Sequence, residues 1–142
     1  MSSSSESGPA PSRPTSGPLP PAPGYGRSSV ADVLTSSAAV LGVPGFNNTL
    51  NLPAAKRVCV VMVDGLGWSL LKQRGGHAPF LRSFVPSARV LTAAFPTTTA
   101  ASLASLGTGR PPGEHGMVGY DVLDPDQDKV VNMLGNWDAG VD

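Results

Sequence analysis

The sequence predicts an α/β fold in which helices cover a mainly parallel sheet. Residues 56–63 begin with two basic side chains and continue as an unbroken apolar run rich in valine, which is typical of a strand buried on both faces. A second apolar run, residues 89–95, ends at Pro96, where a proline would stop a central strand. The segment between the two runs is long enough for the crossover that parallel strands require.

Helix-like patterns flank these two runs. Residues 28–41 predict a short amphipathic helix that ends at Gly42. Its expected buried face consists of Val30, Val33, Leu34 and Leu41.

Three further helices are expected along the chain. One begins at Trp68 and ends near Gly75, the second spans residues 78–84, and the third spans residues 100–106. We expect the second to pack its apolar side chains inward: Phe80, Leu81 and Phe84.

The last part of the chain predicts a β-hairpin that projects beside the expected functional site. Residues 117–123 and 129–134 are its two arms, and the intervening turn contains three aspartates. Their spacing superficially matches a calcium loop, but Lys129 stands where that loop requires glycine. We therefore interpret residues 124–128 as a solvated turn.

Composition limits the other possibilities. Residues 1–27 are mostly Ser, Pro, Gly and Ala and predict a disordered tail, which leaves residues 28–142 as the folding part. Ten basic and ten acidic side chains balance without a basic stripe, so nucleic-acid binding is not expected. No signal peptide or membrane span is visible, and a cytoplasmic location is the default. The single cysteine, Cys59, is expected to be a buried, unreactive thiol.

A carboxylate and a cluster of hydroxyls follow the two apolar runs. Asp64 comes directly after the first run, and residues 97–99 are three threonines that follow Pro96. The carboxyl ends of parallel strands form the ligand crevice of such sheets. A hydroxyl at a helix start also lies at the positive end of the helix dipole, where a phosphate is favoured.

Three motifs in this order resemble the alkaline phosphatase superfamily, most closely its nucleotide pyrophosphatase/phosphodiesterase-like branch. They are Asp64-Gly65, the Pro-Thr-Thr-Thr segment at residues 96–99, and a Thr-Gly-x-x-Pro-x-x-His-Gly pattern at residues 108–116. The resemblance implies a doubly wound, mostly parallel sheet with helices on both faces, of which this chain would be an incomplete part. It also implies hydrolysis of phosphodiester or nucleotide pyrophosphate bonds in a small-molecule substrate.

The resemblance further implies roles for individual residues. Asp64 would bind a metal, and Thr99 would be the nucleophile and a ligand of the same metal, with Thr98 as the alternative nucleophile. Ser102 stands where related enzymes carry an asparagine that binds a phosphate oxygen, which makes it a substrate-binding candidate. The cofactor would be a divalent metal, with two Zn²⁺ ions in the complete enzyme. The His-Gly pair that contains His115 would be structural.

The resemblance also leaves questions open. The family's remaining metal ligands are downstream Asp and His residues, and nothing after Gly116 matches them. We therefore expect this chain to be the amino-terminal portion of such an enzyme and to be inactive alone. A phosphomonoesterase, a phosphonate hydrolase or a sulfatase-like relative is an alternative, as is a non-catalytic remnant that binds phosphate or a partner. The oligomeric state stays open.

Overall fold

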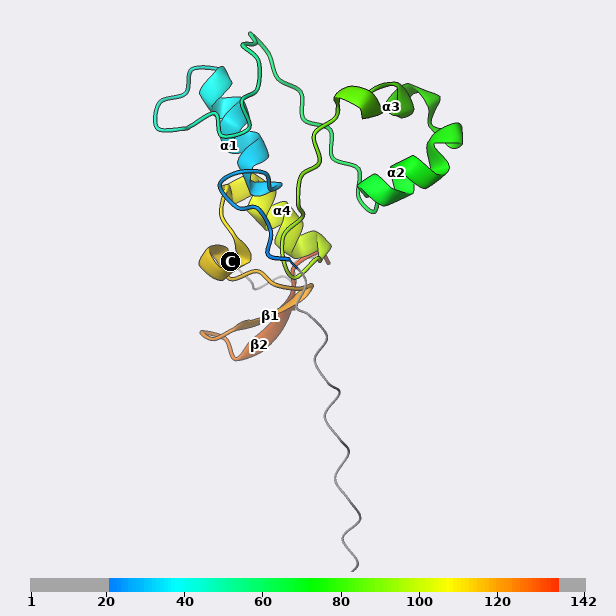
Figure 1. Ribbon diagram of the computed structural model, residues 1–142. Helices are drawn as coiled ribbons and strands as arrows, with labels where there is room; N and C mark the ends of the chain where they lie inside the picture. The colour runs from blue at the N-terminus through cyan, green and yellow to red at the C-terminus, as the bar shows by residue number, and fades with distance from the viewer. Residues whose placement is uncertain (1–20, 136–142) are drawn as a thin grey trace, which may run out of the picture.

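The computed structural model describes residues 21–135, which form helices followed by a small hairpin (Figure 1). The elements are α1 (Ala31–Val40), α2 (Trp68–Arg74), η1 (Gly75–His77), α3 (Pro79–Ser83), η2 (Val85–Ser87), α4 (Thr99–Thr108), α5 (Pro112–His115), β1 (Asp121–Asp124) and β2 (Lys129–Asn132), where η denotes a 3₁₀ helix. The predicted tail, residues 1–27, falls largely outside the described residues and stays a prediction. Among the helices of residues 21–135, none combines the length and apolar character that crossing a bilayer demands.

The sheet differs from the expected one. Strands β1 and β2 pair in antiparallel register, with Val122 opposite Val131, and the structure shows no parallel sheet within residues 21–135. Residues 56–63 and 89–95 run without strand pairing, apart from one parallel bridge between Ser29 and Thr92. A strand needs a hydrogen-bonded neighbour, and the described residues supply none beside residues 56–63. The combination of helices and one small sheet remains compatible with an incomplete α/β domain.

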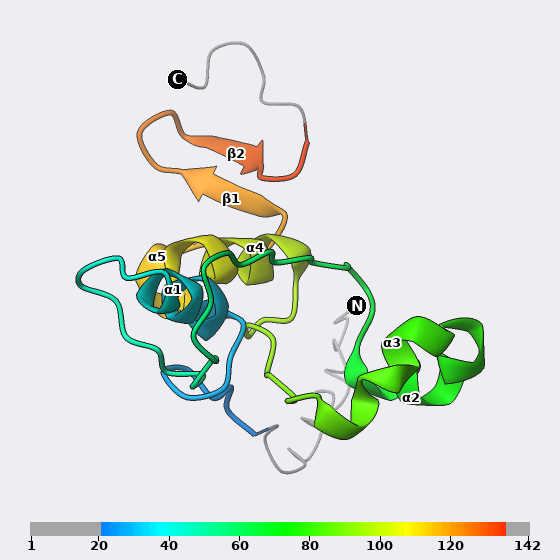
Figure 2. The same ribbon diagram turned by 90° about the horizontal axis from the view of Figure 1, so that it is seen from above.

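Helices α1 and α4 pack against each other through small side chains (Figure 2). Ala31 and Ser36 of α1 are buried, as are Ala101 and Ser105 of α4. Small residues let two helix backbones approach closely, so this contact forms the central packing of the described chain. Leu50 adds a larger apolar side chain to the small core.

The predicted helix at residues 28–41 is confirmed as α1, but its predicted buried face is only partly covered, since Val30 and Val33 are half-buried. Leu34 and Leu41 are exposed, whereas Asp32 and the serines of α1 are buried. The carboxylate of Asp32 accepts hydrogen bonds from the backbone N–H and the hydroxyl of Ser29, at 2.8 and 3.2 Å. Hydrogen bonding satisfies these polar groups, so polar side chains of α1 can be buried.

The predicted helix after the threonine cluster is confirmed as α4, and its two ends explain its length. At the start, the Thr98 hydroxyl accepts a hydrogen bond from the N–H of Ala101 at 3.2 Å, as an N-cap does. At the end, Gly109 adopts a left-handed conformation with φ of 70° and donates its N–H to the carbonyl of Ser105. The Thr98 cap therefore determines that α4 begins at Thr99, within the threonine cluster.

Replacing Gly109 by alanine is expected to destabilise the protein by about 1–2 kcal/mol from the left-handed backbone alone. A Cβ at this position would also clash with the Thr35 methyl group of α1. Gly107 is the matched control because it lies inside α4 and a Cβ there meets nothing within 4 Å beyond its own helix. Gly107→Ala should stabilise the helix by up to about 1 kcal/mol. Urea unfolding of both variants checks the prediction, which is contradicted if the two free energies of unfolding shift equally.

Helices α2 and α3 form a separate arm: among the described helices and strands, they contact only each other and the 3₁₀ helices η1 and η2 (Figure 2). Both helices were predicted, and Pro79 begins α3 as expected of a proline at a first helical position. The inward packing of Phe80, Leu81 and Phe84 is wrong, since all three are exposed. Cys59 is exposed as well, so the prediction of a buried thiol is also wrong. These side chains lack a covering layer within residues 21–135.

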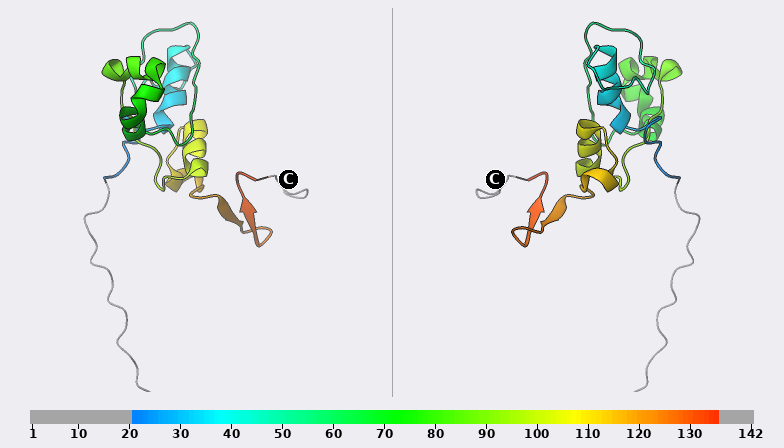
Figure 3. Two further views of the ribbon diagram at one scale, coloured as in Figure 1. Left: turned by 90° about the vertical axis from the view of Figure 1, so that its right-hand side faces the viewer. Right: turned by 90° about the vertical axis from the view of Figure 1, so that its left-hand side faces the viewer.

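The predicted hairpin is confirmed and extends away from the helices (Figure 3). Its turn is stabilised by the Asp124 carboxylate, which accepts hydrogen bonds from the backbone N–H groups of Asp126 and Gln127 at 2.9 and 3.3 Å. This local bonding is the Asx-type turn expected of aspartate. The hairpin begins directly after Tyr120, whose position matters for the site.

Candidate active site

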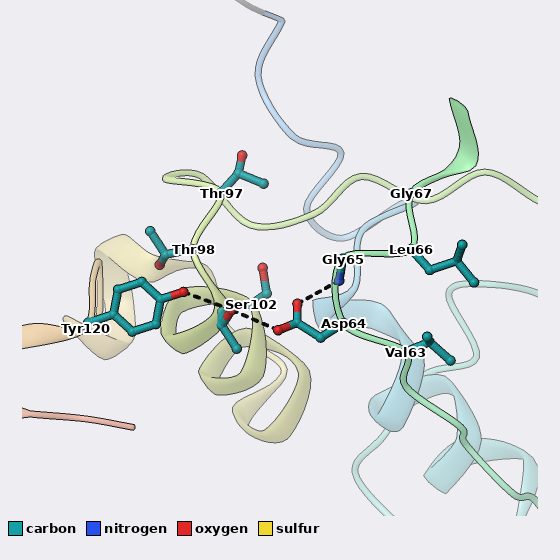
Figure 4. Close-up of a pocket in the computed structure, with 10 residues that line it drawn as sticks. Val63, Asp64, Gly65, Leu66, Gly67, Thr97, Thr98, Ser102 and Tyr120 are labelled. Atoms are coloured by element: carbon teal, nitrogen blue, oxygen red, sulfur yellow. Dashed lines mark hydrogen bonds between the residues drawn. The ribbon is translucent and has the colours of Figure 1, made fainter. Parts of the chain in front are cut away.

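A cavity of about 440 Å³ lies where the chain after residues 56–63 passes the N-terminus of α4 (Figure 4). One wall is residues 63–67, and the opposite wall is residues 97–99 with Ser102 and Tyr120. The cavity therefore combines the two segments that follow the two apolar runs of the sequence. Although the parallel sheet is not formed within the described residues, these two segments still meet.

Asp64 and Thr99 are in direct contact across this cavity. The Thr99 hydroxyl donates a hydrogen bond to Oδ2 of Asp64 at 3.2 Å. The other carboxylate oxygen, Oδ1, accepts the N–H of Gly65 at 2.8 Å, and Gly65 has a φ of 71°. The turn at Gly65 thus orients the carboxylate, with one oxygen held by the backbone and the other facing the threonine.

The geometry separates Thr98 from Thr99. The Thr98 hydroxyl accepts the N–H of Ala101 as the cap of α4 and donates its proton to the carbonyl of Val118 at 3.1 Å. Both hydrogen bonds stabilise the fold. Thr99 is the first residue of α4, and its hydroxyl faces Asp64. This arrangement favours Thr99 over Thr98 as the nucleophile, and the catalytic role itself stays a prediction.

Ser102 also lines the cavity, one helical turn into α4. Its N–H donates to the carbonyl of Thr98 at 3.0 Å, as the first turn of a helix requires. The side chain is half-buried, so its hydroxyl has room to donate one hydrogen bond into the cavity. The predicted substrate-binding role is compatible with this place and is not tested by it.

Tyr120 is a cavity residue that the sequence did not single out. Its phenol oxygen lies 3.3 Å from the Thr99 hydroxyl oxygen, and the ring forms part of the cavity wall. The only available signal was the prediction that the hairpin would lie beside the site. Nothing in the spacing of the motifs distinguished this tyrosine from its neighbours.

His115 lies outside the cavity and supports the fold. Its Nε2 is 3.0 Å from the hydroxyl of Ser105, and its Nδ1 accepts the N–H of Met117 at 3.1 Å. Because Nδ1 accepts, Nε2 carries the proton and donates to the buried Ser105. Both ring nitrogens therefore tie α5 and the following segment to α4, as the structural interpretation of the His-Gly pair anticipated.

Arg110 does not reach the cavity. Its guanidinium forms an ion pair with Glu114 at 3.0 Å on an exposed surface. Exposed pairs of this kind contribute little to stability.

The Asp64 carboxylate and the Thr99 hydroxyl are placed to supply two of the ligands of one divalent cation. Two oxygens that each lie ~2.0–2.2 Å from a tetrahedral zinc are ~3.3–3.6 Å apart, close to the observed 3.2 Å. Carboxylate and hydroxyl oxygens are also suitable ligands for a hard cation. Within residues 21–135, no group of three or more His, Cys, Asp and Glu side chains gathers in a way that would hold a metal, so this pair is at most part of a ligand set.

Residues 58–139 match the family model described as type I phosphodiesterase / nucleotide pyrophosphatase, which covers more than half of the chain. The chain belongs to this family. The matched region includes every residue that lines the cavity, and the resemblance seen in the sequence is thereby confirmed. Searches of curated proteins and of solved structures gave no significant match. Membership places the protein among hydrolases of phosphodiester-type bonds.

Proposed function

We propose that the protein hydrolyses phosphodiester or nucleotide pyrophosphate bonds of a small-molecule substrate, with Thr99 as the nucleophile. The observation that carries this proposal is the 3.2 Å contact between the Thr99 hydroxyl and Asp64 inside a cavity at a helix N-terminus. The N–H groups of the first turn of α4 favour an anion at this end of the helix. In this proposal, the nucleophile, the carboxylate and the bound anion share the N-terminal end of α4.

In this proposal, Thr99 Oγ1 attacks phosphorus as the bond from phosphorus to the leaving oxygen breaks. The hydroxyl proton passes to solvent, because the Asp64 carboxylate that accepts its hydrogen bond would be a ligand of the metal, and the leaving oxygen takes up a proton from solvent. Water then cleaves the phosphothreonine, which releases the phosphate monoester and restores the threonine. Splitting one difficult displacement into two easier ones is the usual advantage of a covalent intermediate.

Asp64 and Thr99 would hold one of two Zn²⁺ ions. When bound, zinc would neutralise charge on the phosphoryl oxygens and favour the deprotonated hydroxyl. The family resemblance implies that further Asp and His ligands complete the site. We therefore propose that the 142-residue chain hydrolyses little by itself, and that assays require the protein translated from the complete coding sequence, called the complete protein below.

A panel of nitrophenyl esters tests the proposed reaction in the complete protein with zinc. We expect bis(p-nitrophenyl) phosphate to be hydrolysed with a higher kcat/KM than either the phosphate monoester or the sulfate ester. Faster hydrolysis of the monoester or of the sulfate ester would instead assign the protein to a phosphomonoesterase or sulfatase-like activity. If none of the three is hydrolysed, the site is not a hydrolase site for these esters and the proposal fails.

A further inference from the structure

We infer that Tyr120 is a positioning residue that fixes the direction of the Thr99 hydroxyl. This inference rests on the proposed function, because it gives Thr99 its role. It assigns a task to Tyr120, the one aromatic side chain among residues 21–135 that contacts the Thr99 hydroxyl. Three features support it: the direction of the hydrogen bonds, the anchoring of the tyrosine backbone, and the geometry of the cavity.

The direction of the hydrogen bonds follows from counting protons. The Thr99 hydroxyl has one hydrogen, which it donates to Asp64 Oδ2, since a carboxylate can only accept. The 3.3 Å contact with Tyr120 therefore has the phenol O–H as donor and Thr99 Oγ1 as acceptor. Thr99 is held between an acceptor on one side and a donor on the other.

The backbone of Tyr120 is anchored from two directions. On the helix side, the carbonyl of Val118 accepts from the Thr98 hydroxyl, and the N–H of Met117 donates to His115. On the hairpin side, the carbonyl of Tyr120 accepts the N–H of Met133 at 2.6 Å. The phenol is thus carried on a fixed segment. In this inference, the hairpin and the His115 contacts act on the site only through the position of the Tyr120 backbone.

A fixed hydroxyl matters because a threonine side chain has several staggered rotamers. Only a rotamer that faces the cavity can align Oγ1 with a bound phosphorus, and misplacement of a reacting group is costly in rate. Tyr120 is 47% exposed, so water competes for its hydroxyl. We therefore expect the loss of its hydrogen bond to cost about tenfold in kcat, the scale of one hydrogen bond of about 1.4 kcal/mol.

The test compares Tyr120→Phe with Tyr25→Phe in the complete protein. Phenylalanine keeps the ring and removes only the hydroxyl, and the Tyr25 hydroxyl bonds the N–H of Phe95 rather than Thr99. In the zinc-free protein, where the Thr99 hydroxyl bonds Asp64 directly, NMR couplings of the Thr99 side chain should show one χ1 rotamer in the wild type and averaging in Tyr120→Phe. In the assay, Tyr120→Phe should lower kcat about tenfold while KM changes less than twofold. Tyr25→Phe should change neither measurement.

A reciprocal variant supports the test without relying on turnover or on the folding of Tyr120→Phe. Thr99→Val keeps the shape of the side chain but removes its oxygen, so the ring signals of Tyr120 should shift while those of Tyr25 stay in place. An unchanged Thr99 rotamer in Tyr120→Phe, or unshifted Tyr120 signals in Thr99→Val, would overturn the inference. If the wild type hydrolyses nothing, the proposed function fails, and the NMR measurements still decide whether Tyr120 positions Thr99.

Discussion

Replacing Thr99 by alanine is expected to lower kcat for bis(p-nitrophenyl) phosphate by at least about 10³-fold in the complete protein. The substitution removes the oxygen that would attack phosphorus, and loss of a covalent nucleophile usually removes most of the catalysed rate. Thr99 is half-buried at the start of α4 and its hydroxyl does not cap the helix, so folding should be little affected. Steady-state kinetics with zinc, together with circular dichroism, checks both expectations.

Thr98→Ala is the matched control, because the same group is removed one residue earlier. That hydroxyl caps α4 and bonds Val118, so its loss should cost about 1 kcal/mol of stability. The kcat should fall by less than about tenfold, through a loosened helix start rather than a missing nucleophile. If Thr98→Ala abolishes turnover while Thr99→Ala retains it, the two threonines exchange roles and the assignment of Thr99 is wrong.

The sequence predicted which residues lie together better than it predicted the sheet. Local rules placed α4, because a threonine cap and a left-handed glycine define its ends. The order and spacing of the motifs indicated that Asp64 and Thr99 belong to one site, and the structure brings their side chains into contact. Such features depend on a few neighbouring residues or on a shared pattern, so they can be predicted without knowing how the rest of the chain packs.

The missed features depend on long-range packing. The apolar run at residues 56–63 has the composition of a buried strand, yet Val61 is 78% exposed, because no described strand lies beside it. The buried face of α1 was misassigned because Asp32 is satisfied by Ser29 and not by solvent. Tyr120 was missed for a similar reason, since only the path of the hairpin segment places its hydroxyl beside Thr99.

Replacing Asp64 by asparagine is expected to lower kcat/KM by about 10³-fold, since metal-assisted charge stabilisation contributes several kcal/mol. Asparagine keeps the size of the side chain and can still accept the N–H of Gly65, but its neutral amide is a poor ligand for zinc. Metal analysis after dialysis should therefore show about one zinc fewer per complete protein.

Asp121→Asn is the control for this charge change. The Asp121 carboxylate accepts a hydrogen bond from the side chain of Asn132 within the hairpin, at 3.1 Å, and does not line the cavity. This variant should retain both zinc and turnover. If Asp64→Asn retains them too, the carboxylate beside Thr99 holds no metal, and the 3.2 Å contact would be only a hydrogen bond that orients the threonine. The two variants together distinguish a metal-binding role of Asp64 from a role that only orients Thr99. Both substitutions remove one negative charge, but only Asp64→Asn removes it from the cavity.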